Sequence, residues 1–467
     1  MHNPQHEVST KSVTTTAFTV RGELTICAAK RHLPHTFIVP EDATHLALHF
    51  VCDPAGAQGL DNMLTLTLFD PTGFRGARHR DGARHDVMIG AHAATPGYLP
   101  GPLPAGEWMI QIDTHRILPG APLHYTLDVE IGVADAAIAA PATPQGKPGA
   151  VVRREAGWVR GDLHSHTNHS DAGDRTVAQL VAEAKATGLD FLFLTDHNTI
   201  APLAEIDALA GPDLLTAGGM ELTTFWGHAL VLGTRRWIDW RFRPGDGAIN
   251  RLAEAVYARG ELFIMAHPGS VGDPTCTGCA WRFGEMMPGA ARVIEIWNGV
   301  WAGDSNNELA LAFYFDWLNQ GRRLVATAGS DTHSPADYTA GPGFNVVYVE
   351  ALSEAALLRA IAAGHLYLSS GPHLVLEAQE QDGAHRMMGD IVVRAATVNV
   401  QWAHCPPGAM LRVLANGQLL HQQAAGASDR FTYAMTPAEA DWLIAELRAE
   451  SGVLLAITNP IFFAQTV

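Results

Sequence analysis

Two short motifs place pairs of metal-binding side chains two residues apart. His164 and His166 are separated by one serine, and Asp331 and His333 are separated by one threonine. Residues i and i+2 of an extended segment project to the same side, so both members of a pair can bind one ion. Glu221 has two carboxylate oxygens and could bridge two ions. Imidazoles and carboxylates suit Zn²⁺, Mn²⁺ or Fe, and such ions make water reactive towards esters.

Other polar residues of the same kinds occur beside apolar runs. A single histidine there is usually a hydrogen-bonded structural residue, and an aspartate is often the N-cap of a helix. The repeated pattern weakens these structural explanations, because so many polar groups converging without a cation would be costly. The candidate metal ligands are His164, His166, Asp171, His197, Glu221, His228, His267, Asp331 and His333.

The elements that must position these residues extend from about Gly157 to Pro372. Apolar runs alternate there with helical patterns, as in the continuous run 191–195. Val177, Leu180, Val181 and Ala184 share one helical face, and further helices are expected near 248–259, 306–320 and 353–363. Repeated strand-then-helix units predict a parallel sheet or barrel, whose ligands bind at the carboxyl ends of the strands.

The flanking regions have a different pattern. Residues 1–132 and 374–467 contain short alternating runs separated by turn residues, which predicts an all-β sandwich on each side. One stretch of the C-terminal region, 437–450, reads as a helix. Residues 133–154 are rich in Ala, Pro and Gly and are expected to be a linker. The middle domain then covers 155–373.

Five motifs in this order resemble those of the polymerase and histidinol phosphatase (PHP) superfamily of metal-dependent phosphoesterases. They read GDLHSHTNHSDAG, LTDHNT, GMEL, AHPG and GSDTH. The resemblance covers about 155–373 and implies a distorted (βα)7 barrel. The flanking β-domains make the layout similar to the CehA/McbA-like branch, which includes carbaryl hydrolase-like enzymes.

The resemblance also implies how the ligands divide among three ions. One ion would take His164, His166, Glu221 and Asp331, a second Asp171, His197 and His333, and a third Glu221, His228 and His267. Asp171 matches an SDG motif that here carries one extra residue, and the spacing of His228 from Glu221 varies in the family. Two ions rather than three therefore remain an alternative. Glu221, Asp331 and His333 are implied to take part in catalysis.

Several nearby residues are expected in supporting roles. Asp196 precedes His197 and would point away from the ions, and Asn298 matches a polar residue that follows a family strand. Arg282, Trp281 and Trp301 are candidates for substrate binding, with surface charge and core packing as the ordinary explanations. Cys276 and Cys279 are compatible with half a zinc site, a redox pair or a purely structural role.

We therefore expect a metal-dependent hydrolase with two or three divalent ions (Zn, Mn or Fe). A metal-bridging hydroxide would hydrolyse a small phosphomonoester or phosphodiester, which places the enzyme among the phosphoesterases. A carboxyl or carbamate ester hydrolase at the same metal site is the first alternative. A non-catalytic binding protein with a vestigial barrel is the second.

Composition restricts the partners. The 467 residues carry 31 Lys and Arg against 48 Asp and Glu, a formal net charge of −17, which argues against binding a nucleic-acid backbone or an anionic membrane surface. Hydrophobic residues make up 47%, enough for folded domains. Neither a signal peptide nor a membrane span is evident, so a cytoplasmic enzyme with a small-molecule substrate is expected. The sequence leaves the oligomeric state open.

Overall fold

The computed structural model describes residues 13–57, 59–133 and 150–464. They form two compact units, mostly of β-strands with few helices. The first unit contains the described residues up to 133, together with 169–171 and 199–202. The second contains the rest, so the expected middle and C-terminal domains belong to one unit. Most of the expected linker, 134–149, lies outside the described residues.

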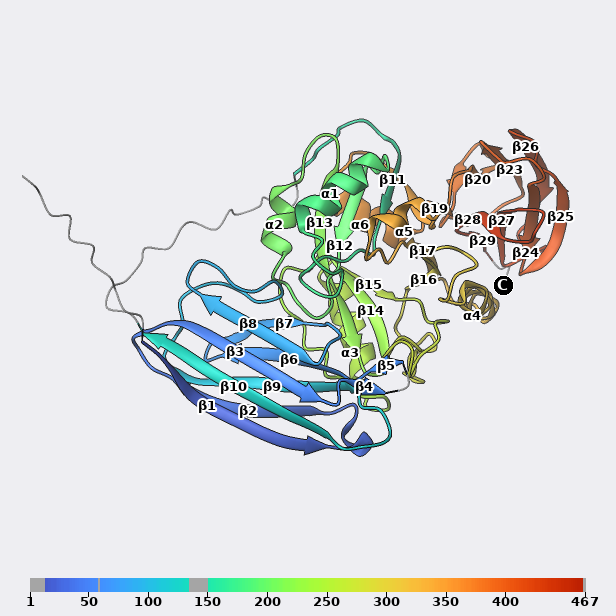
Figure 1. The fold of residues 1–467 in the computed structure, drawn as a ribbon. Helices are drawn as coiled ribbons and strands as arrows, with labels where there is room; N and C mark the ends of the chain where they lie inside the picture. The colour runs from blue at the N-terminus through green and yellow to red at the C-terminus, as the bar shows by residue number, and fades with distance from the viewer. Residues whose placement is uncertain (1–12, 58, 134–149, 465–467) are drawn as a thin grey trace, which may run out of the picture. The chain divides into compact units, whose positions relative to one another are not determined.

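The first unit is built from two antiparallel four-stranded sheets (Figure 1). Alternate residues of both sheets form one apolar core, which includes Leu48, Leu66, Trp108 and Leu127. This is the sandwich that the alternating runs predicted. One sheet has the order β1 (Val13–Leu24), β10 (Leu123–Val133), β3 (Ala43–Asp53) and β8 (Arg84–Gly90). The other has the order β2 (His32–Val39), β9 (Gly106–Arg116), β6 (Met63–Asp70) and β7 (Gly73–Arg78). A 3-10 turn (Ile26–Ala28) and the short pair β4 (Gly56–Ala57) and β5 (Leu60–Asp61) complete it.

The second unit begins with a mixed sheet. Its strands are β11 (Gly157–Asp162), β12 (Phe191–Leu194), β13 (Leu215–Thr224), β14 (Gly227–Leu232), β15 (Leu262–Met265), β16 (Val293–Asn298), β17 (Val325–Gly329), β18 (Phe344–Val349) and β19 (Leu366–Ser369). Strands β11 to β13 are mutually parallel, as are β15 to β17, but β14 is antiparallel to both of its neighbours. β18 is also antiparallel to β11. A clear (βα)7 barrel of parallel strands is therefore not seen.

The reason for the difference lies in the connections. A parallel crossover needs a dozen or more residues, whereas β13 and β14 are joined by only two residues, Phe225 and Trp226. This tight hairpin reverses the chain and places Glu221 and His228 on neighbouring strands. Glu221 lies inside β13 rather than beyond its end.

The helices expected near 248–259, 306–320 and 353–363 all form, within a few residues of the predicted bounds. The helices are α1 (Val177–Ala186), α2 (Leu203–Ala208), α3 (Ala248–Ala258), α4 (Asn307–Asn319), α5 (Pro335–Thr339) and α6 (Glu354–Ala363). In α1, the four residues of the predicted apolar face are buried, and Thr176 and Gln179 form a capping box at its start. The short helices α2 and α5 were not predicted, because neither spans two turns of periodic pattern.

The C-terminal strands form two facing sheets around a second apolar core. One sheet has the order β21 (His385–Met387), β20 (His373–Glu380), β23 (Ala396–Ala403) and β26 (Asp429–Met435). The other contains β28 (Leu454–Thr458), β27 (Trp442–Arg448), β24 (Met410–Ala415) and β25 (Gln418–Ala424), with β29 (Ile461–Phe463) and β22 (Ile391–Val392) at its side. β28 pairs with β19, so this sheet continues the sheet of the middle region.

The predicted helix at 437–450 is wrong. Residues Trp442–Arg448 form β27, in which six consecutive residues are buried. β27 is hydrogen-bonded to β24 on one side and to β28 and β29 on the other. A strand enclosed on its faces and both edges can be apolar without alternation, and tertiary pairing overrides the helix propensity of its Leu, Ala and Glu residues.

β17 pairs with β16 and is the last strand of its sheet, and two buried side chains bond backbone groups that strand pairing leaves free. The Asn345 carboxamide bonds the backbone N–H and C=O of Ala328, at 3.0 and 2.6 Å. The Asn459 carboxamide does the same for Ala326, at 2.8 and 2.9 Å. Both asparagines are fully buried. Each therefore satisfies two backbone groups that a missing strand would otherwise pair.

None of the described helices is both long and apolar enough to cross a membrane.

Replacement of Asn345 tests this substitute for strand pairing. Asn345→Leu leaves the buried N–H and C=O of Ala328 without partners, at about 1–3 kcal/mol each. We expect a loss of about 2–5 kcal/mol in the free energy of unfolding, measured by urea titration. Asn399→Leu, at a half-buried position of β23, makes the same chemical change and should cost much less. Equal losses in the two variants would contradict the role of Asn345.

Candidate metal centre

The segments that follow β11 and β17 bring the two paired motifs together. Asp331 N–H donates to His164 O at 3.0 Å, and His166 N–H donates to Thr332 O at 3.1 Å. The two extended segments therefore run side by side. Their side chains meet as well, because Asp331 Oδ1 lies 3.4 Å from His164 Nε2 and 2.9 Å from His166 Nε2.

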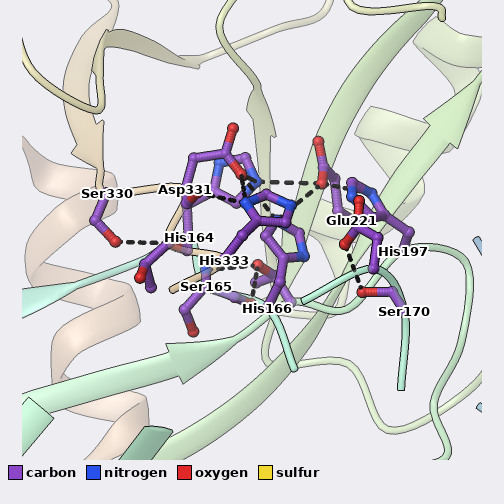
Figure 2. A network of polar contacts seen from close by, with 12 residues as sticks. His164, Ser165, His166, Ser170, His197, Glu221, Ser330, Asp331 and His333 are labelled. Carbon is purple, nitrogen blue, oxygen red and sulfur yellow. Dashed lines mark hydrogen bonds and ion pairs between the residues drawn. The ribbon is translucent and has the colours of Figure 1, made fainter. Parts of the chain in front are cut away.

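Glu221 is the hub of the site. Its side chain is fully buried, and five histidines lie within 3.5 Å of its oxygens. Oε2 is approached by His164, His166 and His197, at 3.2, 3.5 and 2.8 Å. Oε1 is approached by His228 and His267, at 3.1 and 3.3 Å. The two oxygens thus face different histidines, which is the arrangement a bridging carboxylate needs. Figure 2 shows His164, His166, His197, Asp331 and His333 gathered around Glu221.

Backbone contacts fix the Glu221 side of the site. Glu221 N–H donates to Thr195 O, and Asn198 N–H donates to Glu221 O, so β13 and the segment after β12 are held in register. The Asn198 carboxamide also bonds the backbone of Thr223 on both sides, at 2.9 and 3.0 Å. Asn198 has a φ of 56°, a conformation that asparagine tolerates better than most residues. These contacts orient His197 and Glu221 together.

Several polar atoms in this cluster lack hydrogen-bond partners among the described residues. His164 Nε2 and Glu221 Oε2 are 3.2 Å apart, yet neither has a partner in hydrogen-bond geometry. His166 Nδ1 and His267 Nδ1 are also buried without one. Each such atom costs about 1–3 kcal/mol. A cation would satisfy His164 Nε2 and Glu221 Oε2, which face each other without a hydrogen bond, so the donor set fits a divalent metal.

The described residues offer several overlapping donor sets, each with its ligand atoms within 4.8 Å of one another. One set is His164, His166 and Asp331, a second is His164, Glu221 and His267, and a third is His228, His267 and Cys279. His166, His197 and His333 lie together in a fourth. The structure thus brings together eight of the nine expected ligands. Asp171 belongs to the segment 169–171, which groups with the first unit, so its role as a ligand stays a prediction.

Electrostatics favour ionised carboxylates in the site. Burial acts to raise the pKa of Glu221, but the neighbouring His197 and His164 outweigh it and hold the pKa well below its usual range. Burial also acts to raise the pKa of Asp331, but the neighbouring histidines, chiefly His164, hold it well below its usual range. Burial, with His197 and His333 nearby, lowers the pKa of His166 to about 4. His166 is therefore neutral at physiological pH and can offer a nitrogen lone pair.

Glu295 is a functional candidate that the sequence analysis missed. It lies in β16, is almost fully buried, and its Oε1 is 3.1 Å from His164 Nδ1. Its Oε2 accepts the backbone N–H of His267 at 3.0 Å and the amide of Asn298 at 3.2 Å. A carboxylate behind a ligand histidine fixes which nitrogen faces the metal. The available signal was a single carboxylate inside the otherwise apolar strand VIEIW.

The two expected supporting residues contact the motifs directly. Asn298 Nδ2 donates to Asp331 Oδ2 at 3.2 Å, so it orients that carboxylate. Asp196 accepts the backbone N–H of Thr167 at 2.8 Å and its hydroxyl at 2.5 Å. Asp196 thereby holds the segment that follows His166.

A cavity of about 450 Å³ opens beside Asp331 and His333. Its lining includes Asn298, Asp304, Ser305, Asp331, His333 and Asp337, together with glycines. Among the described residues that line it, none is Arg or Lys. The cavity gives a small molecule access to the cluster.

The three predicted substrate-binding residues lie elsewhere. Trp281 is buried, and its indole N–H donates to Phe283 O and Met286 O. Trp301 is also buried, packs against Trp297 and donates to Glu308. Arg282 is exposed. None of the three lines the cavity beside Asp331, and their roles in substrate binding stay predictions.

Comparisons with known proteins give little direct help. No family model matches the chain, and no curated protein matches it. Among solved structures, it is similar to a two-domain protein from Bacteroides vulgatus that contains a predicted PHP-like metal-dependent phosphoesterase. The identity is 14%, the match covers 69% of this chain and 100% of the other, and the TM-score is 0.36.

Glu221→Gln tests the metal centre without changing its shape. Loss of the carboxylate charge leaves five imidazoles without their shared anion, so we expect bound transition metal to fall several-fold, measured by elemental analysis after dialysis. Glu205→Gln makes the same change at an exposed position of α2 and should bind as much metal as the parent protein. Full metal content in Glu221→Gln would contradict the central role of this carboxylate.

Proposed function

We propose that this protein is a metal-dependent hydrolase of the PHP type that acts on a small phosphoester. One observation carries the proposal. Five buried histidines converge on the Glu221 carboxylate, Asp331 lies against two of them, and His164 Nε2 and Glu221 Oε2 lack hydrogen-bond partners among the described residues. Such a set is expensive to maintain in a protein that binds no cation. The ordered motifs of the sequence add support.

The residues would hold two or three divalent ions. His164, His166, Glu221 and Asp331 would hold one ion, and Glu221, His228 and His267 another. His197 and His333, with Asp171, would hold a third. Ions bound in this way supply a reactive nucleophile from water and a Lewis acid for the ester oxygen.

The chain's own residues prepare the site for this chemistry. Glu295 can accept a hydrogen bond from the Nδ1–H of His164, which leaves Nε2 of the same ring facing the cluster. Asn298 holds Asp331 from behind, and Glu295 holds the backbone at His267. Asp331 and His333 belong to the cluster and also line the cavity. A substrate in the cavity would therefore lie beside two of the proposed ligands.

A carboxyl or carbamate ester hydrolase is a second candidate, favoured by the charge of the cavity. Asp304 and Asp337 line it, and no described lining residue is Arg or Lys. Phosphomonoester dianions are usually recognised by Arg or Lys. The lining suits a phosphodiester monoanion or a neutral ester better than a dianion.

The double variant His164→Ala/His166→Ala tests catalysis. Both imidazoles belong to the same donor set, so we expect hydrolysis to be abolished while circular dichroism and gel filtration stay unchanged. His385→Ala, at an exposed position of the C-terminal region, is the control and should retain full activity. Normal turnover in the double variant would remove these two residues from the site. A parent protein that binds less than one transition metal per chain would favour a non-catalytic binding protein.

A substrate panel separates the two hydrolase candidates. With Mn²⁺ added, p-nitrophenyl phosphate, bis-p-nitrophenyl phosphate and a 1-naphthyl carbamate distinguish phosphomonoesterase, phosphodiesterase and carbamate hydrolase activity. Asp304→Asn removes one negative charge from the cavity wall. We expect it to lower KM for the phosphomonoester about threefold and to leave KM for the neutral carbamate unchanged. Asp316→Asn, on the exposed face of α4, is the matched control. An equal effect on both substrates would show that the cavity charge does not select the substrate.

A further inference from the structure

The loop between β15 and β16 places a pair of cysteines beside the metal centre. Thr277 O lies 3.2 Å from His228 Nε2. A Cβ at Gly278 would lie 2.1 Å from Thr224 O, and Gly278 has a φ of +79°. Only glycine therefore lets the loop approach β13 and β14 this closely. The loop segment Cys276–Cys279 thus lies against the His228 side of the site.

Cys279 is the buried member of the pair. It is 6% exposed, and its sulfur is within 4.8 Å of ligand nitrogens of His228 and His267. Both histidines also contact Glu221 Oε1. A sulfur and two imidazoles thus lie close together, a donor set typical of zinc, and both imidazoles also contact a carboxylate oxygen. In the structure, however, Cys279 is joined to Cys276 by a disulfide, so the sulfur cannot act as a thiolate ligand.

Stabilisation of the fold is a weak explanation for this disulfide. The two cysteines are three positions apart. In the chain-entropy description, a disulfide stabilises by restricting the unfolded chain, and the effect grows with the length of the closed loop. A bond across so short a segment restricts little. The position of the disulfide beside His228 and His267 suggests instead a role in metal binding.

We propose that Cys279 is a redox-controlled ligand of the ion at His228 and His267. A dithiol reductant breaks the Cys276–Cys279 bond by donating two electrons, and it becomes a disulfide itself while both cysteines become thiols. Cys279 then loses its proton to solvent and binds the ion as a thiolate, next to His228, His267 and Glu221. Cys276 remains free to re-form the bond on oxidation. The inference rests on the proposed metal centre and adds a ligand to it.

The consequence is a change in metal preference at one part of the centre. Thiolate is a soft ligand that favours zinc, whereas carboxylate and imidazole alone also accept manganese. The reduced protein should therefore retain zinc at this position, and the oxidised protein should exchange it more readily.

Cobalt(II) serves as the probe, because thiolate coordination gives a near-ultraviolet charge-transfer band that imidazole and carboxylate ligands lack. The full-length protein is stripped of metal and loaded with Co²⁺, either oxidised or after reduction by a dithiol that is then removed anaerobically. We expect the band only after reduction. Cys276→Ser leaves Cys279 free and should show the band in both conditions. Cys279→Ser should never show it, and the control Cys27→Ser should behave as the parent protein does.

The outcomes separate this inference from the proposed function. Cobalt that binds to the reduced protein without the charge-transfer band would overturn the role of Cys279 and leave the hydrolase proposal standing. Failure of the parent protein to bind cobalt in either state would overturn the metal centre itself. A band that persists in Cys279→Ser would assign the sulfur ligand to another cysteine and would also overturn the inference.

Discussion

The site depends on one buried negative charge shared by many imidazoles. Glu221 sits inside a strand with every neighbour on its side-chain face buried, where an isolated carboxylate would be strongly disfavoured. Its two oxygens are each approached by a separate group of histidines. The histidines in turn come from strands or strand ends that are distant in the sequence. Glu221 therefore defines the point at which the separate segments must meet.

Sheet geometry makes this meeting possible even though the sheet is not a regular barrel. The hairpin between β13 and β14 reverses one strand, and this reversal is what brings His228 next to Glu221. The ends of β11 and β17 are joined by backbone bonds through His164 and Asp331. Regular parallel order is thus lost at β14, the neighbour of the strand that carries Glu221, and the remaining strands supply their candidate ligands from their carboxyl ends.

Much of the candidate site could be predicted from sequence, because its histidines and carboxylates are of types that bind metals and follow apolar runs. The motif pairs and the histidines at 197, 228 and 267 are of this kind. Glu295 was missed because it lies within an apolar strand and acts through His164 rather than on an ion. The strand at 442–448 was misread because its burial comes from partners distant in sequence, which no local pattern reveals. The disulfide could be raised only as one of several interpretations of the cysteine spacing.

The pairing of β19 with β28 has a consequence for how this protein can be divided. The C-terminal strands are not an appendage joined by a tether, since Asn459 reaches back to bond both backbone groups of Ala326 in β17. A chain that ends at residue 373 would leave the edge of β19 unpaired. It would also remove the Asn459 side chain that bonds β17, the strand that leads to Asp331. Excision, fusion or domain exchange at that boundary would thus disturb the metal-binding half of the molecule, however well the cut suits the sequence pattern.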